Sequence, residues 1–219
     1  MRINWNNIDT VLLDMDGTLL DLHFDNFFWL NYLPKRYAEI HNIPFKEAND
    51  QIHNLSIKTM GTLNWYSTTY WSKELAVDIY RLKKEISGLI KMRPFVQEFL
   101  EQLSLHKKNR VLVTNAHPQS LELKISVTQI NGLLDKIYTS HQFHHPKESQ
   151  KFWYALACQE KFDPEKTLFI DDSVNILQAA SQYGIKQLLG IKKPDSSQSS
   201  VELEGFSSIA NFNEILPIA

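Results

Sequence analysis

Residues 10–20 carry the strongest chemical signal in the chain, because a short apolar run there ends in two carboxylates. Asp14 and Asp16 are one residue apart, follow the apolar residues 11–13 and precede Gly17, which permits a sharp turn. Side chains at i and i+2 of a strand point to the same face, so we expect both carboxylates at the tip of a buried parallel strand. Two carboxylates this close repel unless a cation lies between them or one is protonated. Mg²⁺ accepts such oxygen ligands together with a substrate phosphate, so the segment predicts magnesium-dependent phosphate chemistry.

The same spacing also begins the calcium-binding loop of an EF-hand. That loop requires glycine at its sixth residue, which here is Leu19. An EF-hand also needs helical flanks, whereas residues 11–13 read as a strand. The sequence therefore favours a site at the end of a strand over a calcium-binding loop.

From residue 92 onward, helical and strand-like patterns alternate. The expected strands cover residues 11–13, 110–114, 136–139, 167–170 and 186–190. The expected helices cover residues 121–127, 148–160 and 174–183, after an amphipathic helix marked by Phe95, Phe99, Leu100 and Leu103. This alternation predicts an α/β fold with a doubly wound parallel sheet. Ligands bind such sheets beyond the carboxyl ends of the strands. Further chemically plausible side chains follow the later strands: Thr114, Asn115, Lys147, Asp171 and Asp172.

Residues 21–90 have a different texture, with no convincing strand. Aromatic side chains recur there at helical spacing, as in Phe24, Phe27, Phe28 and Tyr32. Pro44 and Gly61 interrupt the pattern. We therefore expect an inserted helical cap that closes over the site, excludes water and selects the leaving group.

Composition narrows the classes of partner. The 23 basic and 25 acidic residues give a net charge of −2, so no electrostatic argument favours a nucleic acid polymer or an anionic membrane. No apolar run approaches the roughly 20 residues of a spanning helix, and residues 1–9 lack a signal-peptide pattern. The single cysteine, Cys158, permits no intramolecular disulfide. We expect a cytoplasmic protein, and no pattern in the sequence indicates its oligomeric state.

The four strand-end motifs together resemble those of the haloacid dehalogenase-like (HAD) hydrolase superfamily. The resemblance implies a Rossmann-like core with strand order 5-4-1-2-3, formed by residues 1–20 and 91–219, and a helical cap formed by residues 21–90. It also implies a magnesium-dependent phosphoric monoester hydrolase whose substrate is a small phosphomonoester.

The resemblance assigns chemical roles to three residues. Asp14 matches the nucleophile, which attacks phosphorus and forms an aspartyl-phosphate that water hydrolyses. Asp16 matches the residue that protonates the leaving alkoxide and then accepts a proton from water, with its backbone carbonyl contacting the metal. Lys147 supplies an ammonium group beside the transferring phosphoryl group. Its nearest rivals, Lys124 and Lys151, are expected within helices.

The same resemblance implies phosphate and metal contacts. Thr114 offers a hydroxyl and Asn115 an amide N–H to phosphate oxygens, although capping of a strand end is an alternative role for Thr114. The implied metal ligands are Asp14, Asp16 and Asp172. Asp171 replaces a common glycine, and adjacent strand residues point to opposite faces, so we expect it in an outer contact at most. A further acid is often found four residues later in the family, where this chain has Ile176.

Several segments are similar to the bacterial GMP/IMP nucleotidases of this superfamily, namely residues 20–29, 62–66, 70–72, 114–118 and 169–173. The similarity implies hydrolysis of purine nucleoside 5′-monophosphates. Five aromatic residues are then candidates for stacking on the base, at about 1–3 kcal/mol each, and two asparagines are candidates for reading the edge of the base. The sequence does not choose among them: Trp29, Trp65, Tyr66, Tyr70 and Trp71, and Asn26 and Asn64. Packing within the cap is the alternative role for each aromatic residue.

Other functions share the same motifs. A phosphatase or phosphomutase of a sugar phosphate or another small phosphomonoester would contain all four, and release of phosphate without a sugar acceptor would distinguish hydrolysis. A silent binding protein is disfavoured because the nucleophile and the metal ligand are both retained. Zinc is not expected, because the histidines lack a second ligand pair and a cysteine partner. We expect them at the mouth of the site or in solvent: His117, His141, His144 and His145.

Overall fold

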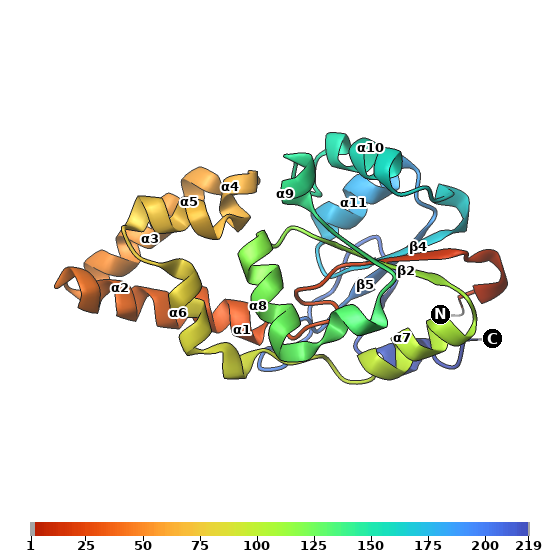
Figure 1. Cartoon of the computed structure of the whole chain (residues 1–219), viewed down its shortest axis with the longest axis horizontal. Helices are drawn as coiled ribbons and strands as arrows, with labels where there is room; N and C mark the ends of the chain where they lie inside the picture. The colour runs from red at the N-terminus through yellow and green to blue at the C-terminus, as the bar shows by residue number, and fades with distance from the viewer. Residues whose placement is uncertain (1–2, 219) are drawn as a thin grey trace.

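The computed structural model describes residues 3–218. Its centre is a six-stranded parallel sheet in the order β3-β2-β1-β4-β5-β6 (Figure 1). The strands are β1 (Thr10–Leu13), β2 (Asn109–Thr114), β3 (Lys136–Thr139), β4 (Thr167–Asp171), β5 (Gln187–Ile191) and β6 (Ser208–Ile209). The predicted parallel α/β sheet and the order 5-4-1-2-3 are confirmed. The edge strand β6 was not predicted, because two residues carry no periodicity.

Two groups of helices accompany the sheet. The first group precedes β2 and comprises α1 (His23–Phe27), α2 (Leu33–His41), α3 (Phe45–Thr59), α4 (Leu63–Tyr66), α5 (Thr68–Leu75) and α6 (Ile79–Glu85), with a π-helical turn at Phe28–Tyr32. The second group comprises α7 (Val96–Leu105), α8 (Pro118–Thr128), α9 (Ser140–Phe143), α10 (Gln150–Gln159) and α11 (Val174–Tyr183). Short 3-10 turns cover Trp5–Asn7, Ser87–Leu89, Ile130–Leu133, Pro164–Lys166 and Phe212–Ile215. No helix within residues 3–218 is long and apolar enough to cross a bilayer.

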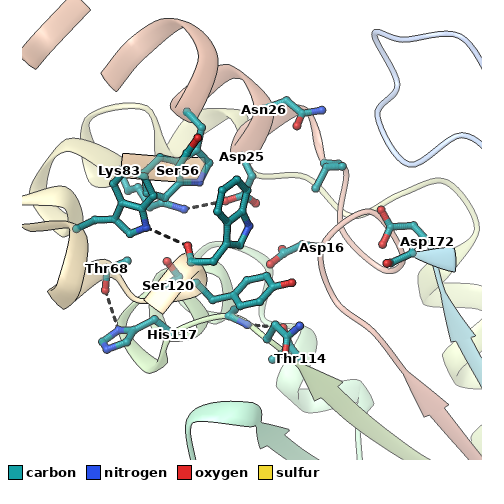
Figure 2. Close-up of a pocket in the computed structure, with 18 of the residues that line it drawn as sticks. Asp16, Asp25, Asn26, Ser56, Thr68, Lys83, Thr114, His117, Ser120 and Asp172 are labelled. Atoms are coloured by element: carbon teal, nitrogen blue, oxygen red, sulfur yellow. Dashed lines mark hydrogen bonds and ion pairs between the residues drawn. The ribbon is translucent and has the colours of Figure 1, made fainter. Parts of the chain in front are cut away.

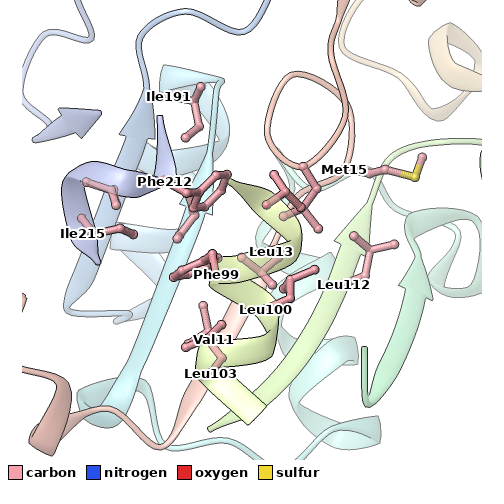
Figure 3. Packing of buried hydrophobic residues seen from close by; sticks show 14 of the residues in the cluster. Val11, Leu13, Met15, Phe99, Leu100, Leu103, Leu112, Ile191, Phe212 and Ile215 are labelled. Carbon is pink, nitrogen blue, oxygen red and sulfur yellow. The ribbon is translucent and has the colours of Figure 1, made fainter. Parts of the chain in front are cut away.

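Strand β1 lies between β2 and β4 in the sheet, and a core cluster packs on each of its faces. Val11 and Leu13 belong to the core cluster that contains Phe99 of α7 (Figure 3). Leu12 packs in the cluster with Phe169 on the other face. Each such buried side chain contributes about 1.5–3 kcal/mol to folding. This packing fixes the position at which the chain leaves β1, in the middle of the sheet.

The beginning of α7 differs from the expectation. Phe95 precedes the helix in a left-handed conformation, with φ of 65°, and its side chain is 45% exposed. Val96 takes the buried position beside Phe99 and Leu100. Helical spacing suggested that Phe95 shares this face, but the turn after Pro94 rotates it outward.

Residues between Phe28 and Leu82, mainly from α2, α3, α5 and α6, form a separate core beyond one end of the sheet (Figure 1). Phe28 and Leu33 are fully buried in it, and the rings of Trp29 and Trp71 lie 4.9 Å apart between centroids. Residues 21–90 therefore contain helices and turns but no strand, as the aromatic periodicity predicted. We call α1–α6 the cap helices.

Residues 193–197 form hydrogen bonds with the first cap helix and the residue before it. The backbone N–H of Leu22 donates to the Pro194 carbonyl at 3.0 Å, and the Asn26 amide donates to the buried Asp195 carboxylate at 2.7 Å. Arg93, just before α7, donates to the carbonyls of Lys193, Pro194 and Ala210. Both junctions between cap helices and sheet are thus held by this segment.

Candidate active site

A cavity of about 530 Å³ lies between the carboxyl ends of the strands and the cap helices. Figure 2 shows Asp16, Thr114 and Asp172 on its core side, and Asn26 and Ser56 on its cap side. Cavities of this size hold ligands such as nucleotides and cofactors, which typically occupy roughly 300–1,000 Å³. The cavity is therefore the candidate ligand-binding site.

Three carboxylates converge on its floor. Leu13 pairs with Ile170 in the sheet, so Asp14 and Asp171 leave the two neighbouring strands at the same level. One oxygen from each of Asp14, Asp171 and Asp172 lies within 4.8 Å of the others. We call these three residues the acidic cluster. Asp14 Oδ2 is buried without a hydrogen-bond partner among residues 3–218, which is costly for a carboxylate oxygen.

The electrostatics of the cluster favour a bound cation. Burial raises the pKa of Asp14 to about 6, against the opposing effect of Lys147. Burial and then the neighbouring carboxylates of Asp171 and Asp14 raise the pKa of Asp172 well above its usual value. A divalent ion would relieve this repulsion and give Asp14 Oδ2 a partner. Hard oxygen donors suit Mg²⁺, so these residues fit the predicted metal.

Lys147 is completely buried in the loop between α9 and α10. Its Nζ atom lies 2.5 Å from Asp14 Oδ1 and 2.8 Å from Asp171 Oδ2. Burial alone would lower the pKa of Lys147, but these two carboxylates outweigh it and raise the pKa. The Asn115 side chain accepts from the Lys147 backbone N–H at 2.9 Å and so fixes the loop. The ammonium group is therefore charged and held beside Asp14.

Asp16 is set apart from the acidic cluster. Its Oδ1 atom lies 2.6 Å from Nζ of Lys124, a buried lysine on α8. Burial raises the pKa of Asp16 to about 6, although Lys124 opposes the shift. The metal contact expected for Asp16 is its backbone carbonyl, and the contact of its side chain with Lys124 leaves that carbonyl unaffected.

Gly17 makes the sharp turn after Asp16 possible. Its φ is +88°, and its N–H donates to the Leu20 carbonyl at 2.8 Å. A Cβ atom at this position would lie 2.4 Å from Asp172 Oδ2 and 3.0 Å from Pro194 Cβ. The absent side chain therefore leaves the space that Asp172 occupies.

Thr114 and Asn115 both line the cavity. The Thr114 hydroxyl accepts from the Ala116 N–H at 3.0 Å, and the Asn115 amide donates to Glu148 at 3.0 Å. Glu148 also accepts from the hydroxyl of Tyr66 on α4 at 2.6 Å. Asn115 thus helps to hold the Lys147 loop, and Tyr66 links a cap helix to it.

The sequence-predicted residues of the cap differ in whether they line the cavity. Trp65 lines the cavity and its carbonyl accepts from the Trp71 indole at 3.0 Å, whereas Asn64 is exposed and does not line the cavity formed by the described residues. His117 also lines the cavity and contacts Thr68 Oγ1 at 2.7 Å. The His141 ring packs edge-on against the His117 ring, with 4.9 Å between the ring centroids. Of these side chains, the structure brings Trp65 and His117 to the site.

Sequence reasoning missed Asp25 and Lys83, and it set Lys124 aside as a helix residue. All three line the cavity. One signal was present, because Lys124 lies three and four residues after Leu121 and Ser120 and so shares their helical face, which packs against the core. A lysine on the buried face of a helix needs a partner, and that partner lies on another element.

The chain is similar to several known proteins. A family model described as haloacid dehalogenase-like hydrolase matches residues 11–189. The "GMP/IMP nucleotidase YrfG" of Escherichia coli (strain K12) is 39% identical over 217 residues, which cover 99% of this chain and 98% of that protein. The "Phosphorylated carbohydrates phosphatase" of Thermotoga maritima is 21% identical and covers 96% and 98% of the two chains. The crystal structure of a HAD phosphatase from Thermococcus onnurineus superposes with a TM-score of 0.79 at 17% identity, and covers 94% and 95%.

Proposed function

The chain belongs to the haloacid dehalogenase-like hydrolases and is a phosphomonoester hydrolase of that family; we propose that its substrates are purine nucleoside 5′-monophosphates, especially GMP and IMP. The proposal rests on one relative above all, because 39% identity over nearly the whole of both chains includes the cap helices as well as the core. The cap side of the cavity supports it with aromatic lining from Trp29, Trp65 and Trp71.

The proposed reaction has two displacements at phosphorus. Asp14 attacks the phosphorus atom, the bond from phosphorus to the 5′ oxygen breaks, and Asp16 gives its proton to that oxygen. Water then attacks the aspartyl-phosphate, the bond from phosphorus to Asp14 breaks, and the proton of the water passes to Asp16. The products are the nucleoside and inorganic phosphate. A buried carboxyl whose pKa is raised to about 6 suits both proton transfers near neutral pH.

The remaining site residues position the substrate phosphate and neutralise its negative charge. Asp14 and Asp172 would hold Mg²⁺, with Asp171 beside them and the Asp16 carbonyl as a further donor. Bound Mg²⁺ supplies positive charge against the phosphate oxygens and the carboxylates. Lys147 adds a fixed ammonium, and Thr114 and Asn115 offer a hydroxyl and an amide to the phosphate.

Substrate choice is tested by phosphate release from a panel of phosphomonoesters. We expect kcat/KM for GMP and IMP to exceed that for AMP, pyrimidine nucleotides and sugar phosphates by about tenfold or more, because mispaired buried polar groups discriminate strongly. A six-oxo purine presents an acceptor and a donor where AMP presents the reverse pattern. A phosphosugar that proved the better substrate would overturn the nucleotidase proposal and leave the phosphatase chemistry intact.

Trp65 provides a second test of the same proposal. We expect Trp65→Ala to reduce the preference for purine nucleotides and to leave hydrolysis of p-nitrophenyl phosphate nearly unchanged, because a lost base contact removes about 1–3 kcal/mol. Asn64→Ala, next to it on α4, is the matched comparison and should have the smaller effect. Equal losses on both substrates in Trp65→Ala would mean that Trp65 serves the packing of the cap.

Substitution of Lys147 provides a third test of the proposed reaction. Lys147→Ala should lower kcat and kcat/KM together by roughly 100-fold or more, which is the scale of one lost electrostatic contact in a transition state. Lys147→Arg should restore activity in part, since a planar guanidinium does not reproduce a compact charge. Lys151→Ala is the control, because Lys151 is exposed on α10. Wild-type kinetics in Lys147→Ala would remove the residue from the mechanism.

A sugar-phosphate phosphatase is the second candidate. It is favoured by the relative from Thermotoga maritima, a phosphorylated carbohydrates phosphatase that matches this chain over nearly its full length at lower identity. The substrate panel above decides between the two, because both reactions release phosphate and use the same core residues.

A further inference from the structure

Lys124 is a buried cation that the proposed reaction does not use. It lies on α8 with 2% of its surface exposed, and its Nζ atom is 2.6 Å from Asp16 Oδ1 and 2.6 Å from Asp25 Oδ2. Asp16 belongs to the turn after β1, and Asp25 belongs to cap helix α1. One ammonium group therefore joins a core helix, the proposed proton-transfer residue and the cap.

The contacts continue into the cap. Asp25 Oδ1 lies 2.7 Å from Nζ of Lys83 on α6, which is 3% exposed and lies 5.0 Å above the Phe28 ring. Asp16, Lys124, Asp25 and Lys83 thus form a row of alternating charge, and all four line the cavity. Figure 2 shows Asp25 with its bond to Lys83, and Asp16 nearby at the wall of the cavity.

Stability alone is a weak reason for this arrangement. Removing two charges from water costs several kcal/mol per ion, and apolar side chains of similar volume often serve a protein equally well. A second observation points to the reaction. Asp16 is two residues from Asp14, yet its carboxylate is not part of the acidic cluster, and Lys124 is the side chain that engages it within residues 3–218. Since Lys124 binds Oδ1, Oδ2 is the oxygen available for proton transfer.

We propose that Lys124 is a positioning residue that holds the Asp16 carboxyl away from the acidic cluster and directs it toward the leaving-group oxygen. The inference rests on the proposed function, in which the bond from phosphorus to the ester oxygen breaks as the proton of Asp16 passes to that oxygen. Lys124 remains a protonated ammonium throughout. Because its other contact is Asp25, the cap helices help to keep Asp16 in place.

The inference is tested with two substrates whose leaving groups differ in their need for a proton. The alkoxide of GMP needs a proton as it departs, whereas p-nitrophenolate leaves without one. Lys124→Met keeps the length of the side chain and removes the charge. We expect it to lower kcat for GMP by about 100-fold, the low end for general acid catalysis, with KM changed by less than about threefold. Asp16 also serves the second displacement, so the informative measurement with p-nitrophenyl phosphate is the pre-steady-state burst of nitrophenolate, whose rate should stay within about threefold of wild type.

A matched control separates positioning from folding. Arg110→Met removes another well-formed ion pair, to Asp135 at 2.6 Å, at the amino end of β2 and outside the cavity. It should lower thermal stability and leave the ratio of kcat for GMP to the nitrophenolate burst rate unchanged. Asp25→Asn keeps Lys124 on Asp16 and removes the charge on the cap side, so it should reproduce the selective loss on GMP with a smaller magnitude. If Lys124→Met does not fold, Asp25→Asn carries the test.

The outcomes separate this inference from the proposed function. Equal losses on GMP turnover and on the nitrophenolate burst, in Lys124→Met or in Asp25→Asn, would mean that the charge row only fastens the cap, and the inference would be wrong. If the wild-type protein prefers a sugar phosphate, the nucleotidase proposal fails. The Lys124 test then proceeds with that ester, since a sugar hydroxyl is an equally poor leaving group.

Discussion

Asp14→Asn should lower kcat by several orders of magnitude, because the carboxamide keeps the shape of the side chain and loses the attacking charge. The site around it should survive, since Lys147 retains Asp171 at 2.8 Å. The measurement is phosphate release from GMP, together with the mass of acid-quenched protein, which should reveal a phosphorylated wild-type chain and an unmodified variant.

Asp9→Asn is the matched control for this variant. Asp9 stands at the other end of β1, where it forms an exposed ion pair with Lys166 at 3.4 Å. Its kinetics should equal those of the wild type. Retention of even about a tenth of kcat by Asp14→Asn would contradict the assignment of Asp14 as nucleophile, since loss of a nucleophile costs far more.

Removal of divalent metal is expected to abolish activity, and added Mg²⁺ to restore it. Three carboxylates converge on one point, burial and mutual repulsion raise the pKa values of Asp14 and Asp172, and a bound cation relieves that repulsion. Mg²⁺ should also raise the melting temperature, because an ion that binds only the folded state stabilises it. Calcium should substitute poorly, since its larger and looser ligand shell misplaces the phosphate.

Asp172→Ala should raise the Mg²⁺ concentration needed for activity, or abolish activity, and should remove the rise in melting temperature. Asp50→Ala is the control, because Asp50 pairs with Lys46 on the exposed side of α3. Full turnover by the wild-type protein in excess chelator would rule out the metal site.

The parts of the site that sequence could predict follow from the geometry of parallel sheets. Once residues 11–13 and 167–170 are read as neighbouring strands, the residues that follow them must meet at one edge. Local signals were equally clear in α11, which runs from Val174 to Tyr183 as its periodicity and the following Gly184 indicate. Strong periodicity and end signals agree there, so little depended on tertiary packing.

The parts that failed depend on how distant segments pack. Lys124 contacts residues 108 and 99 positions away in the chain, and no local pattern encodes that pairing. Helix α4 has only four residues, so periodicity could not tell which of Asn64 and Trp65 faces the cavity. The alternation rule for Asp171 and Asp172 ended with the strand, because β4 stops at Asp171 and the chain turns before Asp172.

The segment at residues 193–197 has a consequence for the order in which the molecule is completed. A ribosome delivers Asp14, the cap helices and Arg93 long before it delivers Pro194, Asp195 and Ala210. The hydrogen bonds that hold α1 and the residues before α7 therefore join these segments to residues that are synthesised much later. Asp14 is synthesised early, but the hydrogen bonds at the junctions of the cap form only after residues 193–210 have been added, so a chain that stops before them lacks these bonds.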